Sequence, residues 1–158
     1  MSGFVTPNTP NLTDFLTFLA TSVQIPASAL PVGSDWPGYA LNQAMALAIP
    51  PSGLTPGVMY SLAVYNGATH TLFAIAPDQP GQTYFAAARG SGAGGYSLIT
   101  PSTGLVSASA DQGTSQNLAT PEWAMQMTAD QLDYYKTPWG RAFLAWNQKY
   151  GPTIWGLT

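Results

Sequence analysis

The chain has 158 residues, of which 46% are hydrophobic and only 7% are charged, against about a quarter charged in an ordinary soluble domain. The absence of cysteine excludes disulfides, zinc–thiolate sites, iron–sulfur clusters and thiol nucleophiles, and a single histidine argues against a histidine-based metal site. The length suits one folded domain, 1–158. With a net charge of −3, copies of the chain repel one another weakly, so we expect this domain to pack against other subunits.

The N-terminal third of the sequence predicts an arm and two helices. Residues 1–11 hold two prolines and form an extended N-terminal arm. Thr13 is expected to cap a helix that starts at Asp14, whose carboxylate suits the positive end of the helix dipole. Ser34 is expected to cap a second helix that runs to about Ala48. Because this helix is apolar nearly all round, we expect neighbours to bury it on several sides.

The apolar stretch 58–76 allows two interpretations. Asn66-Gly67 between two apolar runs is typical of a hairpin turn, whereas the spacing of the large apolar residues is near-helical and slightly favours a helix. Those residues are Val58, Leu62, Tyr65, Leu72 and Ala76. Polar residues in the middle and the lack of flanking basic residues indicate a buried core segment rather than a membrane helix.

The region after this stretch alternates short elements and loops. Thr83–Arg89 predicts a short helix, and the glycine-rich 90–95 predicts a flexible loop. Two Ser/Thr-rich runs flank Asp111-Gln112-Gly113, which predicts an exposed β-hairpin over 103–119.

The C-terminal region predicts two capped helices. Thr128 and Gln131 form a capping box for a short helix that ends near Lys136. Thr137 is the expected N-cap of the last helix, which Pro138 begins. An aromatic stripe follows at helical spacing and indicates core packing before a sugar or base platform. Its members are Trp139, Phe143, Trp146 and Tyr150.

The C-terminal tail, 151–158, ends in apolar residues beyond the last helix. Ile154, Trp155 and Leu157 need something to dock on. They either fold back on their own core or anchor in a neighbouring subunit, and the sequence leaves both open.

Catalytic and phosphate-binding motifs are weak. Glycines at 90, 92 and 95 match the dinucleotide fingerprint in spacing, but an alanine-rich helical segment precedes them where a strand is required. His70 with Asp78 and a serine could make a hydrolase triad, yet no G-x-S-x-G elbow supports it. Asp133 and Lys136 indicate a surface pair. Four basic residues, none before Arg89, leave no basic patch for gripping nucleic acid.

Two stretches carry a family resemblance. Residues 104–109 read G-L-V-S-A-S and precede a Ser/Thr-rich return strand, and residues 137–144 read T-P-W-G-R-A-F-L. This resembles a family of small tailed-bacteriophage proteins, the head completion proteins or head-to-tail adaptors, with a "G-x-V-S-S-A-S" hairpin and a "T-P-[YW]-G-x-x-[YF]-L" helix. The likeness favours a helix for 58–76. It implies a mainly α fold: a small bundle of four to six helices with one protruding β-hairpin and extended termini.

The resemblance implies a structural function in the virion, which is assembled in the host cytoplasm. Such adaptors form a ring, commonly of about twelve copies, beneath the portal protein. The ring extends the DNA channel, through which DNA passes without specific binding, and provides the platform for the tail or stopper protein. No catalysis, cofactor, metal or membrane is expected. Candidate subunit and portal contacts are Val106, Ser107, Ser109, Arg141, Ile154, Trp155 and Leu157.

Without the family resemblance, the residues alone leave other functions open. The chain could be a small monomeric carbohydrate-binding module that uses exposed Trp and Tyr residues, or a hydrolase that uses His70. Within virion proteins, a tail terminator or a decoration protein is also open.

Overall fold

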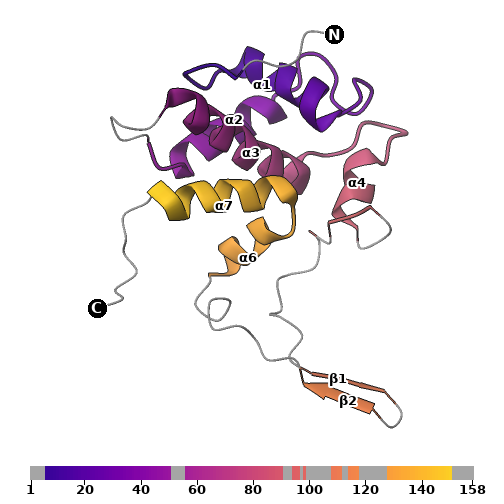
Figure 1. Ribbon diagram of the computed structural model, residues 1–158. Helices are drawn as coiled ribbons and strands as arrows, with labels where there is room; N and C mark the ends of the chain where they lie inside the picture. Colours follow the sequence, from indigo (N-terminus) through magenta and orange to yellow (C-terminus); the bar gives the residue numbers. More distant parts are fainter. Residues whose placement is uncertain are drawn as a thin grey trace.

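The computed structural model describes residues 6–50, 56–90, 94–96, 98, 108–111, 114–117 and 128–150. Over these residues the chain is mainly helical with about six helices, which confirms the predicted fold class at that level (Figure 1). The helices are α1 (Leu12–Phe18), the π-helical turn η1 (Leu19–Val23), α2 (Trp36–Leu47), α3 (Gly57–Ile75), α4 (Tyr84–Arg89), α6 (Ala129–Tyr135) and α7 (Pro138–Tyr150).

Two short strands are described, β1 (Ala108–Asp111) and β2 (Thr114–Asn117). They pair antiparallel, with Ala108 opposite Asn117 and Asp111 opposite Thr114. The rest of the hairpin predicted over 103–119 lies outside the described residues, so a protruding hairpin stays a prediction. Most of the N-terminal arm is described, from residue 6, and has neither helix nor strand before α1; the 151–158 tail lies outside the described part.

Helix α3 is the centre of the bundle, packed against α2 and α7 (Figure 1). Between Ala63 and Phe73 every side chain but that of Asn66 is buried. Asn66 donates its side-chain amide to the Leu62 carbonyl at 2.9 Å, one turn back, so the Asn-Gly pair continues the helix. The helix predicted over this stretch is therefore confirmed, and the hairpin alternative is wrong.

Two predicted helix caps are wrong. Asn11, in extended conformation, caps α1: its side-chain oxygen accepts from the Asp14 backbone N–H at 2.9 Å, so Thr13 lies inside the helix. Ser34 does not cap α2, because the helix begins one residue later than predicted and Ser34 belongs to the preceding turn, where its backbone N–H is bonded to the Pro31 carbonyl. Asp35 occupies the N-cap position with helical dihedral angles and makes no side-chain cap.

The caps predicted at the C-terminal helices are confirmed. The Thr128 hydroxyl accepts from the Gln131 backbone N–H, and the Gln131 side chain accepts in return from the Thr128 N–H, which completes the capping box of α6. The Thr137 hydroxyl accepts from the Gly140 N–H at 2.9 Å and caps α7. A Cβ at Gly140 would collide with the Tyr134 carbonyl, so this glycine allows α6 and α7 to meet closely.

Two charged side chains join the C-terminal end of α3 to α4. The Asp78 carboxylate, just after α3, accepts from the Phe85 and Ala86 backbone N–H groups at 2.7 and 2.8 Å and so caps α4. The Arg89 guanidinium, at the end of α4, donates to the Ala76 carbonyl at 2.6 Å, beyond the last turn of α3. Each charge lies at the helix end whose dipole it complements.

The close packing of α3 on α7 yields a prediction at Gly67. A Cβ there would lie 2.7 Å from the buried Phe143 ring, so we expect Gly67→Ala to destabilise the fold by about 1–2 kcal/mol despite the better helix propensity of alanine. Gly38, also helical but with nothing within 4 Å of its Cβ position, is the matched control. Urea unfolding should show Gly38→Ala neutral or stabilised; equal stabilisation of both variants would contradict the packing argument.

The two backbone hydrogen bonds that Asp78 accepts at the start of α4 yield a second prediction. Asp78→Ala removes the acceptor of two backbone N–H groups and should cost about 1–2 kcal/mol of unfolding free energy. Asp35→Ala removes a carboxylate that makes no cap and should change stability by less than about 0.5 kcal/mol. Thermal denaturation of both variants, followed by circular dichroism, compares the two; similar shifts would show that the Asp78 bonds contribute nothing specific.

Candidate functional site

Of the seven residues predicted as interface candidates, the structure describes the side chain of one. Arg141 is exposed on α7, and its guanidinium donates to the Tyr135 carbonyl at 2.9 Å, where α6 ends. It therefore ties α6 to α7 from the surface. Ser109 lies in β1, and only its backbone is described. The others, Val106, Ser107, Ile154, Trp155 and Leu157, lie outside the described residues.

His70 is a buried core residue rather than an accessible base. It is 5% exposed, its ring packs at a tilt against that of Tyr134 with centroids 4.3 Å apart, and its Nδ1 lies 2.8 Å from the Thr137 hydroxyl. That hydroxyl also accepts from the Gly140 N–H, and its own proton is suited to donation to His70 Nδ1 in the tautomer that carries its proton on Nε2. The histidine thus joins α3 to the start of α7.

The charge state of His70 follows from this burial. Loss of solvation lowers its pKa from 6.5 to about 4; the Asp133 carboxylate raises it and the Lys136 ammonium lowers it, both to a smaller extent. The imidazole is neutral at pH 7, consistent with Nδ1 as an acceptor. The structure brings His70 to Thr137 and not to Asp78, whose carboxylate is bonded to α4, so the imagined triad is not assembled.

The glycine motif at 90–95 lacks the context of a dinucleotide site. Helix α4, and not a strand, leads into Gly90. After the glycines the chain turns back along α4, where the Tyr96 and Leu98 N–H groups bond to the Ala88 and Arg89 carbonyls. No helix N-terminus faces the glycines among the described residues of this loop.

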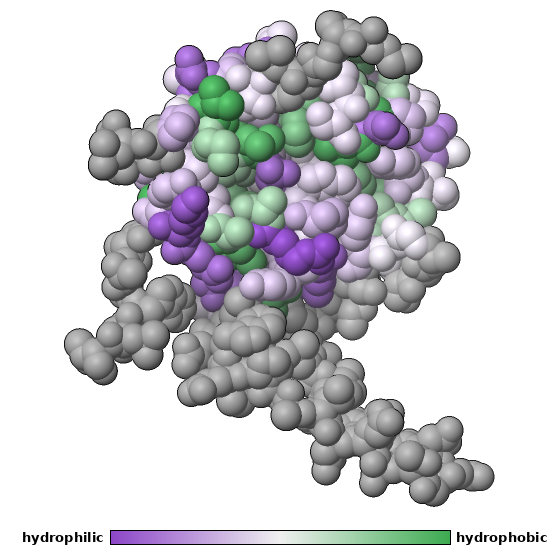
Figure 2. All heavy atoms as spheres, viewed as in Figure 1, coloured by the Kyte–Doolittle hydropathy of each residue, from purple (hydrophilic) through white to green (hydrophobic). Residues whose placement is uncertain are grey.

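Three of the four aromatic residues in the stripe of α7 pack in or against the core, as predicted, and the half-buried Tyr150 packs against the Trp146 ring. Trp139 stacks flat on Phe73 with ring centroids 4.9 Å apart. Phe143 and Trp146 are buried, and the Trp146 indole donates to the Ile49 carbonyl at 3.2 Å. The outer face of α7 carries hydrophilic side chains (Figure 2). This helix therefore offers no aromatic platform for a sugar or a base.

Helix α2 is less buried than predicted. Its small residues and Leu41 pack inward, but the side chains of Trp36, Tyr39 and Leu47 are 38%, 57% and 50% exposed. The described residues cover α2 mainly on the side of α3 and α1, so burial on several sides stays a prediction. A helix that is apolar on all sides can indicate either a core helix or a surface that a partner covers.

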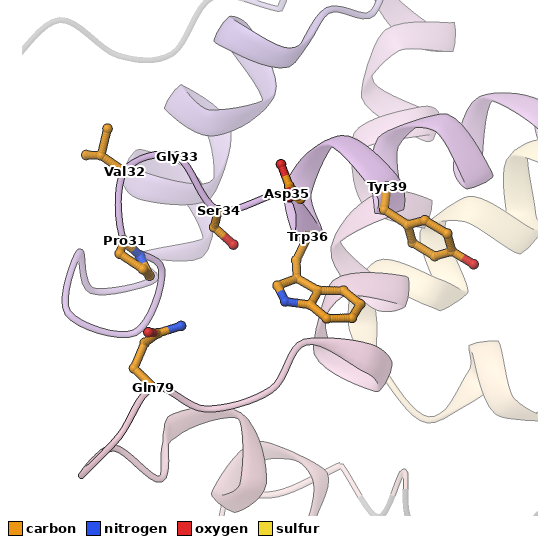
Figure 3. A pocket seen from close by; sticks show the side chains of 8 residues that line it. All are labelled: Pro31, Val32, Gly33, Ser34, Asp35, Trp36, Tyr39 and Gln79. Carbon is orange, nitrogen blue, oxygen red and sulfur yellow. The ribbon is translucent and has the colours of Figure 1, made fainter.

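A hollow of about 500 Å³ lies beside the start of α2 (Figure 3). Trp36 borders it on one side and Pro31 on the other, while the Ser34 and Gln79 side chains point towards it (Figure 3). Its lining residues are Pro31, Val32, Gly33, Ser34, Asp35, Trp36, Tyr39 and Gln79. Trp36 and Tyr39 supply aromatic surface and Ser34, Asp35 and Gln79 supply polar groups, so the lining is mixed. Sequence reasoning missed this feature because Gln79 is brought there from beyond α3.

Metal and membrane sites find no support in the described part of the chain. No three His, Cys, Asp or Glu side chains gather there in a way that could hold a metal ion. None of the described helices is both long and apolar enough to cross a bilayer.

No protein-family model, curated protein or solved structure matches this chain significantly.

The buried imidazole yields a pH prediction. The pKa of His70 is about 4 in the fold and about 6.5 when unfolded, so the unfolded state binds more protons between these values and stability falls as the pH drops from 6.5 towards 4. From about pH 7 to about pH 4.5 the loss should be on the order of 2–3 kcal/mol. His70→Asn keeps an acceptor for Thr137 but cannot titrate.

Urea unfolding at both pH values compares the two proteins, which share all their carboxylates. The pH-dependent loss should shrink by most of that amount in His70→Asn. An equal loss in both proteins would show that other groups cause the pH dependence.

Proposed function

We propose that this protein is a head-to-tail adaptor of a tailed bacteriophage, a structural virion protein that forms a ring beneath the portal. The supporting observation is that each residue of the Thr137–Gly140 motif serves the packing of α7. Thr137 caps the helix and bonds His70, Pro138 begins it, Trp139 stacks on Phe73, and Gly140 admits the Tyr134 carbonyl. Because each residue of the motif has a role in packing, the motif supports a resemblance to the adaptor family in architecture as well as in sequence.

The character of the surface supports assembly with other subunits. The described residues include eight large hydrophobic side chains that are exposed. The ion pair between Lys136 and Asp133 is local, since it joins α6 to the residue that follows it. Figure 2 shows hydrophobic groups scattered among hydrophilic ones on the visible face. A ring subunit buries much of its surface, and few charges keep the desolvation cost of that burial low.

The charge balance suits a conduit for DNA. A net charge of −3, with no basic residue before Arg89, lets duplex DNA slide through a ring lumen without adhering. The portal, neighbouring copies and the tail or stopper are the proposed partners, and the function needs no cofactor. Arg141, Ser109 and the five candidates outside the described residues, at 106, 107, 154, 155 and 157, are the proposed set of contacts.

Electron microscopy of the chain mixed with the portal protein of the same virus tests the proposal. A ring of added density beneath the portal, absent from portal alone, is the expected result. A monomer that leaves the portal unchanged and shifts its tryptophan fluorescence with glycans would favour the carbohydrate-binding module. Density at the tail end or on the capsid shell would instead favour a tail terminator or a decoration protein.

A further inference from the structure

The first residues that the structure describes, 6–11, form an extended segment that lies against the bundle, here called the arm segment. Its two prolines, Pro7 and Pro10, are half-buried, whereas Asn8 and Thr9 between them are exposed and the chain bends there. The arm segment therefore meets the bundle through its prolines and not through the polar side chains between them. Because a proline ring fixes φ, docking costs this segment less conformational entropy than an ordinary chain of the same length.

Three residues spaced four apart on one face of α3 form the α3 stripe, namely Gly57, Ser61 and Tyr65. At its first end, the Asn8 carbonyl comes so close to Gly57 that a Cβ there would lie 2.5 Å from the carbonyl oxygen. At its other end, the Tyr65 hydroxyl accepts from the Asn11 backbone N–H at 3.1 Å and donates to the Asn11 carbonyl at 3.3 Å. The α3 stripe thus contacts backbone groups, which every extended chain offers.

The arm segment and the α3 stripe match in length. From Gly57 to Tyr65 the helix rises about 12 Å, and the chain from Asn8 to Asn11 spans at most about 11 Å. The Tyr65 side chain leans towards the start of the helix and so closes the difference. The arm segment therefore runs along the α3 stripe and passes Ser61, its middle residue.

Ser61 gives the α3 stripe an unused hydrogen-bonding group. The residue is fully buried, and its hydroxyl has no hydrogen-bond partner among the described residues. A buried hydroxyl without a partner is unfavourable. An extended chain that passes Ser61 without the bend at Asn8 and Thr9 can bring a backbone carbonyl within reach of it. The arm segment thus occupies the α3 stripe without satisfying all of it.

The surroundings of the α3 stripe favour an uncharged occupant. Neither 1–13 nor 36–77 contains an Asp, Glu, Lys or Arg residue. Asp14, the charge that follows the arm segment, accepts from the Asn11 side chain at 2.6 Å. A charged occupant would therefore lose hydration without gaining an opposite charge.

We propose that the α3 stripe is a docking site for an extended, uncharged, proline-containing segment of a partner protein, which displaces the arm segment. The arm segment shows the mode of recognition, because it already makes the backbone contacts at Gly57 and Tyr65. A partner segment adds the hydrogen bond to Ser61 that the arm segment leaves unmade. Tyr65 keeps its place when the arm segment leaves, since its ring packs on Phe15 and Phe18 of α1. The site goes beyond the proposed function and does not depend on it.

Displacement of the arm segment leaves the packing of α7 intact. Helix α1, which follows the arm segment, lies across the α2–α3 pair from α7 (Figure 1). The α3 residues that contact α7 or its cap are not those of the stripe; they include Tyr60, Gly67, His70 and Phe73. The bundle therefore keeps its core while one extended segment replaces another.

Peptide titration of the full chain tests the docking site. Pro7→Gly with Pro10→Gly raises the entropic cost of docking the arm segment and leaves the α3 stripe unchanged. A synthetic peptide with the sequence of residues 6–11 and blocked ends is added to this double variant and to the native chain. It should bind the double variant roughly tenfold more tightly, because the competing arm segment is weakened. NMR titration, followed at the backbone N–H signals of the α3 stripe, measures the binding.

Two tyrosines of α3 distinguish the stripe from the rest of the helix. In the double variant, Tyr65→Phe removes the hydroxyl that bonds to the docked backbone and should weaken peptide binding roughly fivefold. Tyr60→Phe is the matched control, since the Tyr60 ring contacts Trp146 on the α7 side, and it should leave binding unchanged. Circular dichroism checks that each variant is folded.

A set of blocked hexapeptides with two prolines at different spacings tests the partner. At least one should bind the double variant roughly three- to tenfold more tightly than the peptide of residues 6–11, because it bonds to Ser61. Ser61→Ala should remove that advantage and leave the binding of the 6–11 peptide unchanged.

The outcomes separate this site from the proposed function. No binding to the double variant, or equal losses in Tyr65→Phe and Tyr60→Phe, would overturn the docking site, whether or not a ring forms on the portal. Hexapeptides that never exceed the 6–11 peptide, or dimers of the native chain that Tyr65→Phe dissociates, would show that only this chain's own arm docks there and would overturn the partner. Peptide binding as expected, without a ring on the portal, would overturn the adaptor function alone.

Discussion

The fold depends on burying α3, a helix that carries polar side chains into the core. Each of three polar groups in it has a defined partner. The Tyr65 hydroxyl accepts from the Asn11 backbone N–H at 3.1 Å, Thr69 donates to the Tyr65 carbonyl within α3, and His70 bonds to Thr137. Two of these partners come from other elements, the start of α1 and the cap of α7. Because an unpaired buried polar group is costly, these bonds fix where the outer helices lie.

The scarcity of charge gains a structural meaning from this arrangement. Much of the described charge is used at helix ends: Asp14 beside Asn11 in the first turn of α1, Asp78 on α4, and Arg141 on the last turn of α6. Arg89 does the same for the carbonyls at the end of α3. Charges held on backbone groups orient helices without covering the surface. The long range before Asp78 carries no charge, and it includes both the buried α3 and the exposed side chains of α2.

Local chemistry predicted the elements well and their exposure poorly. The caps at Thr128 and Thr137 follow from side chains within one turn, so the sequence sufficed. At the start of α1 two capping residues compete two positions apart, and the bond from Asn11 to Tyr65, which only the tertiary structure supplies, favours the earlier one. The exposed side of α2 was harder still to predict, since a helix with apolar residues on all sides does not indicate which side its own chain covers. Here that side is the one facing α3.

In the proposed ring, the weak charge of the copies raises the question of what stops self-association from extending without limit. Each added subunit gains the same contact and meets little repulsion, since the net charge is only −3 per copy. Closure must then come from the angle that the contact imposes or from a template that sets the number of copies. A portal ring is such a template, because it presents a fixed number of identical sites. On this argument a moderate contact between copies is an advantage in the proposed ring, since a stronger one would let copies polymerise before they reach the portal.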